Sequence, residues 1–236
     1  MPTGRLSAVL RAMAEAGADD AASPVDRICA AAVALLSLSG AGLSLMVDGQ
    51  LRGTAGVSDP GIAAVQELQL MLGEGPCVDA WESSAPVMEP ELADPVPVRW
   101  PAFGPAGVTA GIRAVFALPL HVGAIRVGVL VLYRDRAGAL TADELVDGLV
   151  LADVAVHTVL GLQAGAPADG LHELLAKAPP HWAEVHQATG MVSAQLDVSL
   201  DEAFVRLRGH AFAEGLDLRV VAREVVERRL RLEGPA

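Results

Sequence analysis

Arginine is the residue with the clearest capacity for chemistry in this sequence, and it is concentrated near the C-terminal end. Residues 204–231 contain seven arginines against four acidic residues, a net charge of +3 in a chain whose total is −12. Planar guanidinium groups bind phosphates and base edges, and unstacked RNA bases can lie on them. The acids also follow the spacing of ordinary helix ion pairs, such as Glu224 before Arg228 and Glu227 before Arg231. The pattern therefore fits either an RNA-binding surface or a solvated helix surface.

A second candidate is Cys77, which lies between Glu74 and Asp79 in the segment GEGPCVDA (residues 73–80). A cysteine reacts as the thiolate, and neighbouring carboxylates raise the pKa of a thiol rather than lower it. A redox enzyme would also need a properly grouped set of cysteines, whereas Cys29 falls on the first predicted helix and Cys77 in a predicted loop. We therefore expect Cys77 to be a small buried residue, with a thiol sensor or, less readily, a redox enzyme as the alternatives.

Other patterns of catalytic or cofactor chemistry are absent from the sequence. The six histidines lack the HExxH or paired-cysteine context of a metal site. No phosphate-binding glycine loop, nucleophile elbow or receiver-type acidic cluster occurs. We expect the protein to be no enzyme, and we expect no metal and no cofactor.

The composition is that of a folded protein of a reducing compartment. The 236 residues are 52% hydrophobic, which excludes disorder for most of the chain, and two cysteines cannot build a disulfide scaffold. Residues 28–47 carry no charge, but their period changes from helical to alternating, so we expect a buried helix and a strand rather than a membrane span. No compact apolar stretch of a secretory signal is present. We expect a cytoplasmic protein without membrane contact.

The first 160 residues alternate between helical and strand periods. Ser23-Pro24 is typical of a helix start, Asp48-Gly49 of a hairpin turn, and Thr141 with Glu144 of a capping box. This order predicts an α+β fold in which helices cover an antiparallel sheet. The expected elements are helices over 24–38, 60–72 and from 141 onward, strands over 41–47, 51–57, 113–121 and 126–133, a loop over 73–80, and a short strand and short helix between 86 and 105.

The last 60 residues show only the helical period. Helices are expected over 180–196, 199–215 and 217–232, and their short connections predict a small all-α bundle after the linker-like segment QAGAPADG (163–170). Such a small bundle has a thin core, so we expect it to pack against a second copy of the chain or against the N-terminal body. The expected dimer seam is the apolar stripe Trp182, Val185, Thr189, Val192 and Leu196.

Short motifs in the tail fall on the predicted helices. They are Gln187-Ala188-x-Gly190-Met191 on the first helix, then Ser199-x-Asp201-Glu202-Ala203 and Leu207-Arg208 on the second. With them, residues 185–232 resemble an ANTAR domain, a three-helix RNA-binding module of transcription antitermination regulators. Many family members carry Lys before the glycine, where this chain has Thr189. The resemblance implies binding to paired stem-loops with six-base loops in nascent RNA, which prevents a terminator from forming.

The body carries the motifs GAGLSLM (40–46), GEGPCVDA (73–80), ALPLHVG (117–123) and GVLVLYRD (128–135), with Arg113 entering a strand. On these motifs residues 24–160 resemble a GAF domain, a sensory α+β fold. The resemblance implies a sensor for an unidentified small-molecule or redox signal. Its pocket is expected near Cys77, Trp81 and Arg113.

We therefore expect an N-terminal segment (1–22), a GAF-like sensor domain (23–162), a linker or helical connection (163–178) and an ANTAR RNA-binding domain (179–236). The expected function is a cytoplasmic antitermination regulator gated by its sensor domain, and a homodimer is implied because two stem-loops need two modules. The alternative is a ligand-sensing protein–protein adaptor. The expected RNA-binding residues are Gln187, Gly190, Arg206, Arg208, Arg219, Arg223 and Arg228.

Overall fold

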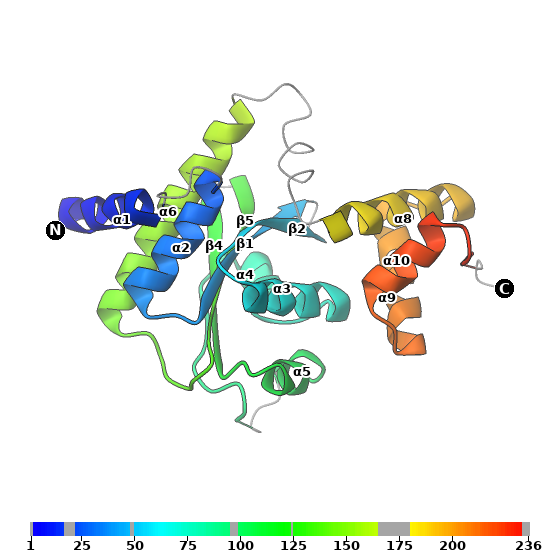
Figure 1. The fold of residues 1–236 in the computed structure, drawn as a ribbon, viewed down its shortest axis with the longest axis horizontal. Helices are drawn as coiled ribbons and strands as arrows, with labels where there is room; N and C mark the ends of the chain where they lie inside the picture. Colours follow the sequence, from blue (N-terminus) through cyan, green and yellow to red (C-terminus); the bar gives the residue numbers. More distant parts are fainter. Residues whose placement is uncertain are drawn as a thin grey trace. The chain divides into compact units, whose positions relative to one another are not determined.

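An antiparallel sheet organises the N-terminal part of the chain in the computed structural model (Figure 1). The model describes residues 2–16, 22–47, 50–94, 99–123, 125–164 and 180–232. Among these residues the sheet has five strands in the order β2-β1-β5-β4-β3, and every neighbouring pair is antiparallel. The strands are β1 (Gly40–Val47), β2 (Gln50–Val57), β3 (Val87–Glu89), β4 (Ala114–Val122) and β5 (Ile125–Arg134).

Helices cover both faces of this sheet. Figure 1 shows α1, α2 and α6 on one side of it and α3, α4 and α5 on the other. Because both faces are covered, β4 and β5 contain continuous buried runs instead of alternating ones. The predicted α+β fold is confirmed. The helices are α1 (Pro2–Ala16), α2 (Pro24–Leu36), α3 (Pro60–Leu72), α4 (Pro76–Ser83), α5 (Phe103–Thr109) and α6 (Ala142–Ala164).

The start of α2 follows from its capping residues. Ser23 Oγ accepts a hydrogen bond from Asp26 N at 3.1 Å, and Asp26 Oδ2 accepts one from Ser23 N at 3.2 Å. The helix ends before Ser37, which takes a left-handed φ of 48°, and β1 begins at Gly40. The uncharged residues 28–47 therefore form a helix followed by a strand, as their change of period predicts.

The segment 73–80 differs from its prediction as a loop, because α4 begins within it. Pro76 lies in the first turn, where its missing N–H is not needed, and Gly75 reaches it with a φ of 130° that favours glycine. Cys77 N donates to the side-chain oxygen of Gln69 at 2.6 Å. The hydrogen-bond cap of α4 is thus supplied by Gln69 of α3, and Pro76 is the local sequence signal of this helix start.

The second unit of the chain, His172–Ala236, is a helical bundle. It contains α8 (Pro180–Leu196), α9 (Leu200–Glu214) and α10 (Leu218–Val226). Ser199 Oγ accepts from Glu202 N at 3.2 Å, and Asp217 Oδ1 accepts from Arg219 N at 2.7 Å, so both predicted caps form. The third helix ends at Val226, six residues earlier than predicted. The predicted linker falls, from residue 165 to 178, outside the described residues.

The apolar stripe of α8 is buried inside its own bundle. Val185, Thr189 and Val192 are each at most 3% exposed, and α8 contacts both α9 and α10. The prediction of a dimer seam along this stripe is therefore wrong for these residues, because their side chains form the core of the bundle. The side chain of Trp182 lies outside the described part of the structure.

Candidate functional site

Two of the predicted RNA-binding arginines form local ion pairs. Arg206 Nη2 lies 2.6 Å from Glu202 Oε1, one helical turn earlier in α9. Arg219 Nη2 lies 2.7 Å from Asp217 Oδ2, the residue that caps α10. Exposed pairs of this kind contribute only about 0.3–0.5 kcal/mol to a helix, so a phosphate could displace either carboxylate.

Two further arginines pair over longer distances. Arg223 Nη2 of α10 lies 3.4 Å from Glu184 Oε2 of α8. Arg229 binds Glu224 at 2.7 Å and also contacts Glu227. The pair with Glu224 raises the pKa of Arg229 and lowers that of Glu224. The charges of these arginines are therefore partly neutralised within the bundle.

Arg208 has a packing role in this structure. Its guanidinium carbon lies 5.9 Å from the centroid of the Phe204 ring, and its half-buried side chain has a pKa lowered by desolvation. A guanidinium over a ring is held by a cation–π attraction. Arg208 is consequently anchored on the surface of α9.

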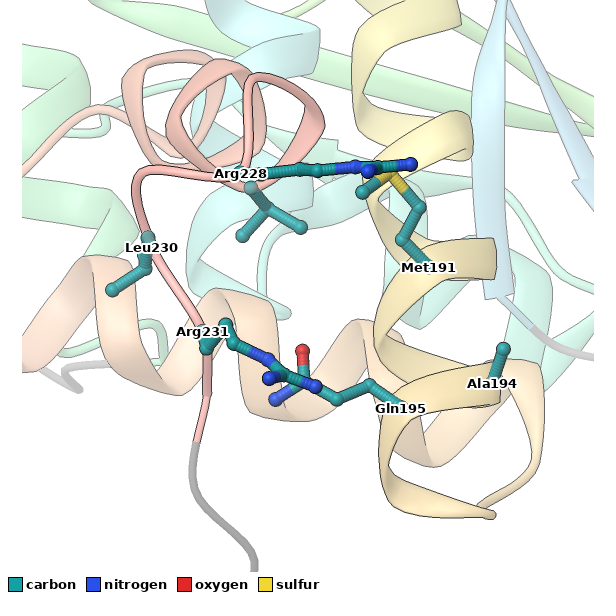
Figure 2. A pocket seen from close by; sticks show the side chains of 7 residues that line it. Met191, Ala194, Gln195, Arg228, Leu230 and Arg231 are labelled. Carbon is teal, nitrogen blue, oxygen red and sulfur yellow. The ribbon is translucent and has the colours of Figure 1, made fainter.

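Arg228 and Arg231 differ from the four paired arginines, since neither lies within ion-pair distance of a carboxylate among the described residues. Both line a pocket of about 600 Å³ between α8 and the segment that follows α10. Figure 2 shows Arg228 extending toward Met191 and Arg231 toward Gln195. The wall between the two cations is largely apolar. The pocket is lined by Met191, Ala194, Gln195, Val225, Arg228, Leu230 and Arg231.

The backbone at Arg228 takes an unusual conformation. Its φ is 61°, in the left-handed region that favours glycine. Arg228 N donates to Val225 O at 3.0 Å and Arg229 N to Glu224 O at 2.8 Å, which is the hydrogen-bond pair of a Schellman motif. This motif ends α10 and turns the chain across α8, which explains why the third helix is shorter than predicted.

The two expected residues on α8 both face outward. Gln187 is exposed, and Gly190 is half-buried with nothing within 4 Å of the place where a Cβ would stand. A glycine inside a helix costs about 1 kcal/mol relative to alanine. Among the described residues no atom lies close to this position, so tight packing against another helix does not explain why Gly190 is a glycine.

In the N-terminal unit, Cys77 is fully buried. Burial raises the pKa of its thiol to about 12, and a hydrogen bond with Ser44 offsets part of this effect. Desolvation also raises the pKa of the buried Cys29. Neither cysteine forms thiolate readily near neutral pH, which supports the interpretation of Cys77 as a buried packing residue.

The acids beside Cys77 act elsewhere, contrary to their predicted effect on the thiol. Glu74 Oε1 accepts from the backbone N–H groups of Ala102 and Phe103 at 2.6 and 2.7 Å, at the start of α5. Asp79 Oδ2 accepts from Arg99 and Trp100. Desolvation rather than these carboxylates causes the shift in the pKa of Cys77.

A buried polar network lies between α3 and the sheet, next to Cys77. The amide of Gln66 donates to Ser44 Oγ at 2.8 Å and accepts from Thr54 Oγ1 at 3.0 Å. Gln69 holds the N–H of Cys77. Because these groups satisfy one another, this face of the sheet is a packed polar core.

Trp81 and Arg113, the other predicted sensor residues, have separate environments. Arg126 lies over the Trp81 ring at 5.5 Å and donates to the Trp81 carbonyl at 3.0 Å. Arg113 Nη1 donates to the carbonyls of Val108 and Ile112 at 2.9 and 3.0 Å. Arg113 is thus a brace for the turn after α5.

In the described ranges, no group of three His, Cys, Asp or Glu side chains is placed to hold a metal ion. Within the same ranges, Ala142–Leu162 of α6 is long and apolar enough to cross a membrane by length and composition. A core helix passes the same test, and α6 packs on α2 and β4. This single helix is therefore weak evidence for a membrane span.

Sequence reasoning named Arg228 but missed the residues that make a pocket around it, Met191, Gln195 and Arg231. A helix that continued to residue 232, as the sequence predicts, would have carried Arg231 further along the axis of α10 and not back across α8. The sequence did contain one signal for the end of α10, the charged run Glu227-Arg228-Arg229 directly after the apolar pair Val225-Val226. At this point the helix ends and the chain returns to α8. Only the left-handed residue shows where that end lies.

Two family models match the chain, the GAF domain over residues 18–153 and the ANTAR domain over residues 175–226. The first match covers more than half of the chain, which therefore belongs to the GAF domain family. With the second match, the chain is a GAF and ANTAR domain-containing regulator of the antitermination kind. This domain content is regulatory rather than catalytic.

One solved structure supports the fold of the N-terminal unit at a TM-score of 0.52. The GAF domain of an Acinetobacter phosphoenolpyruvate-protein phosphotransferase is 13% identical, with a TM-score of 0.52, over 68% of this chain and 95% of that one. The corresponding domain from Coxiella burnetii is 14% identical (TM-score 0.48; 67% and 96% covered). The free methionine-R-sulfoxide reductase of Neisseria meningitidis is 14% identical (TM-score 0.48; 69% and 94% covered). At these identities the likeness concerns the fold alone. No similar sequence was found among curated proteins.

Proposed function

We propose that the protein binds stem-loop RNA through its C-terminal unit and so prevents transcription termination, under the control of its GAF unit. The observation that carries this proposal is the ANTAR match together with two arginines that lack carboxylate partners among the described residues and flank one pocket. Guanidinium groups beside an apolar wall suit the unstacked bases and phosphates of an RNA loop. The RNA is a nascent transcript with paired six-base loops, and the protein acts in the cytoplasm.

A homodimer provides the two modules that paired stem-loops require, and it raises the local concentration of the second module once the first has bound. The N-terminal unit offers an apolar surface for this contact. Leu10 of α1 and Leu149 of α6 are 51% and 44% exposed, and Arg5 ties α1 to α6 through Asp143 and Asp147. We place the dimer contact on this α1–α6 surface in place of the α8 stripe.

The GAF unit supplies the signal. The raised pKa of the buried thiols opposes redox sensing through Cys77 or Cys29, so a small molecule is the favoured signal. The packed polar core beside Cys77 means that such a molecule binds elsewhere on the unit or rearranges that core.

One observation favours the alternative, a protein–protein adaptor. Val205 and Phe212 lie seven residues apart on the same side of α9, and Phe212 is 70% exposed. An exposed aromatic of this kind is a plausible anchor for a partner protein.

Filter binding with the full chain separates the two functions. The probe is a transcript that carries two hexaloop stem-loops, and its control has the same stems with scrambled loops. RNA recognition predicts tighter binding to the intact loops, and in-vitro transcription through a terminator should then yield more read-through product. Equal binding to both RNAs would reject the RNA function and favour the adaptor.

A further inference from the structure

We propose that the pocket between α8 and the end of α10 receives one unpaired nucleobase from the RNA loop, held between Arg228 and Arg231. This inference rests on the proposed RNA-binding function and specifies its recognition site. The two guanidinium groups extend from the segment after α10 toward Met191 and Gln195 on α8 (Figure 2).

The first argument is the distribution of charge. Glu202, Asp217, Glu184 and Glu224 each accept an ion pair from a different arginine. Arg228 and Arg231 have no such partner among the described residues, and both are exposed. Arg208 also lacks a carboxylate partner among the described residues, but its half-buried side chain lies over the Phe204 ring. The exposed unpaired arginines of the described bundle are therefore those at this pocket, where their charge attracts a polyanion.

The second argument is the chemistry of the wall. Met191, Ala194, Val225 and Leu230 provide apolar contact that a free phosphate or a simple anion cannot use. A nucleobase has apolar faces that stack on guanidinium planes, with polar edges at its rim. Gln195 donates its amide to Leu232 O, and its side-chain oxygen has no donor among the described residues. That oxygen can accept a hydrogen bond from the exocyclic amino group of adenine, guanine or cytosine.

The third argument is strain at Arg228. The left-handed φ of 61° at the end of α10 would be taken by glycine without cost, yet an arginine stands there. Non-glycine residues in this conformation also end α2 and α4, at Ser37 and Ser84, but strained backbone is enriched at functional sites. In this position the strained residue is also one whose side chain lines the pocket and extends toward Met191 of α8 (Figure 2).

The experiment combines base removal with side-chain removal in the full chain. One loop nucleotide at a time is replaced by an abasic site in both hexaloops, and Kd is measured for wild type, Arg228→Gly and Arg231→Ala. The matched control is Arg229→Ala, which removes one neighbouring charge outside the pocket. For wild type and the control, one abasic position should weaken binding about tenfold, the range of a single base stack. For both pocket variants the same replacement should have no further effect.

Three outcomes would overturn the inference. An abasic penalty of equal size in wild type and pocket variants would mean that the base lies elsewhere, while the RNA function stands. A poly-glutamate peptide that displaces RNA from wild type but not from Arg231→Ala would assign the pocket to an acidic protein segment. Failure of wild type to distinguish intact from scrambled loops would end both this inference and the proposed function. A thermal melt guards against unfolding, because Arg228→Gly should have a Tm no lower than wild type.

Discussion

At the scale of single residues, the arginines of the C-terminal unit differ more in their ion-pair partners than in their positions in the sequence. Arg223 and Arg228 are five residues apart, yet the first pairs with Glu184 on another helix and the second faces a pocket. The sequence shows that arginines gather in the tail, but an ion pair between residues 39 positions apart cannot be seen in local spacing. The sequence therefore predicts which arginines could bind RNA, and the structure shows which of these exposed arginines have no carboxylate partner among the described residues.

Replacing Arg228 with glycine should stabilise the bundle while weakening RNA binding. Glycine relieves the left-handed strain at the end of α10, an effect of about 1 kcal/mol in the free energy of unfolding. Denaturant unfolding of the full chain measures it. Arg229→Gly is the control: its φ is not positive and it loses the pair with Glu224, so stability should fall. A destabilised Arg228→Gly variant would contradict the assignment of strain.

Cys77 should resist alkylation and should destabilise the protein at high pH. Burial raises the pKa of the Cys77 thiol to about 12 in the folded protein, whereas the pKa of a thiol in the unfolded chain is about 8.5. The stabilisation is thus complete below the unfolded pKa and is lost as pH rises toward 12, by about 2 kcal/mol at pH 10. Unfolding free energies at pH 8 and pH 10, compared with those of Cys77→Ala, measure this share. Rapid reaction of one native thiol with a disulfide reagent at pH 8 would show that the burial is wrong.

At the scale of elements, starts were predicted better than ends. Ser23, Ser199 and Asp217 cap their helices with their own side chains, so the sequence signal and the physical cause coincide. The start of α4 was missed because its cap comes from Gln69 of another helix. The end of α10 was missed because an arginine takes the left-handed position where glycine is the usual signal.

The α8 stripe offers a test of the corrected role of Val192. It is fully buried in the bundle, so Val192→Glu places a carboxylate in the core and should unfold the C-terminal unit, a loss of about 3 kcal/mol or more. Circular dichroism of the full chain should show reduced helix content. Gln187→Glu, on the exposed side of the same helix, should have little effect. A folded Val192→Glu variant that is merely monomeric would restore the stripe as a dimer seam.

The proposed dimer contact belongs to α1 and α6. Leu149→Glu introduces a charge on the exposed apolar side of α6 and should shift the dimer toward monomer without unfolding the unit. Light scattering at several concentrations measures the change. Glu82→Lys, an exposed position on α4, is a charge-changing control that should leave the mass unchanged. A wild-type monomer at tens of micromolar would exclude the contact.

At the scale of the whole molecule, the charge is divided along the chain. Residues 1–170 carry nine basic and nineteen acidic residues, a net −10, while residues 204–231 carry +3. The net charge of the whole chain therefore gives an RNA no general attraction, and its binding depends on close contacts with the basic segment. Non-specific binding of RNA is therefore weak, and this is an advantage for a protein that must discriminate between transcripts.

The dependence of Kd on salt should reveal how many arginines take part. Each phosphate contact on single-stranded RNA contributes about −0.7 to the slope of the logarithm of the association constant, 1/Kd, against the logarithm of the salt concentration. If Arg228 and Arg231 alone meet the RNA, and each also neutralises a backbone phosphate beside the base that it holds, the slope per protomer is about −1.4; if all seven arginines of residues 204–231 release their partners and bind phosphate, it is about −4.9. Because four of them already have carboxylate partners, we expect a slope near the smaller figure, about −1.4.

Titration of the full chain with RNA from 50 to 400 mM salt measures this slope, and Arg231→Ala should reduce its magnitude by about 0.7. A slope near zero would mean that the tail does not recognise a polyanion, and a slope near −5 would mean that RNA opens the ion pairs of the bundle.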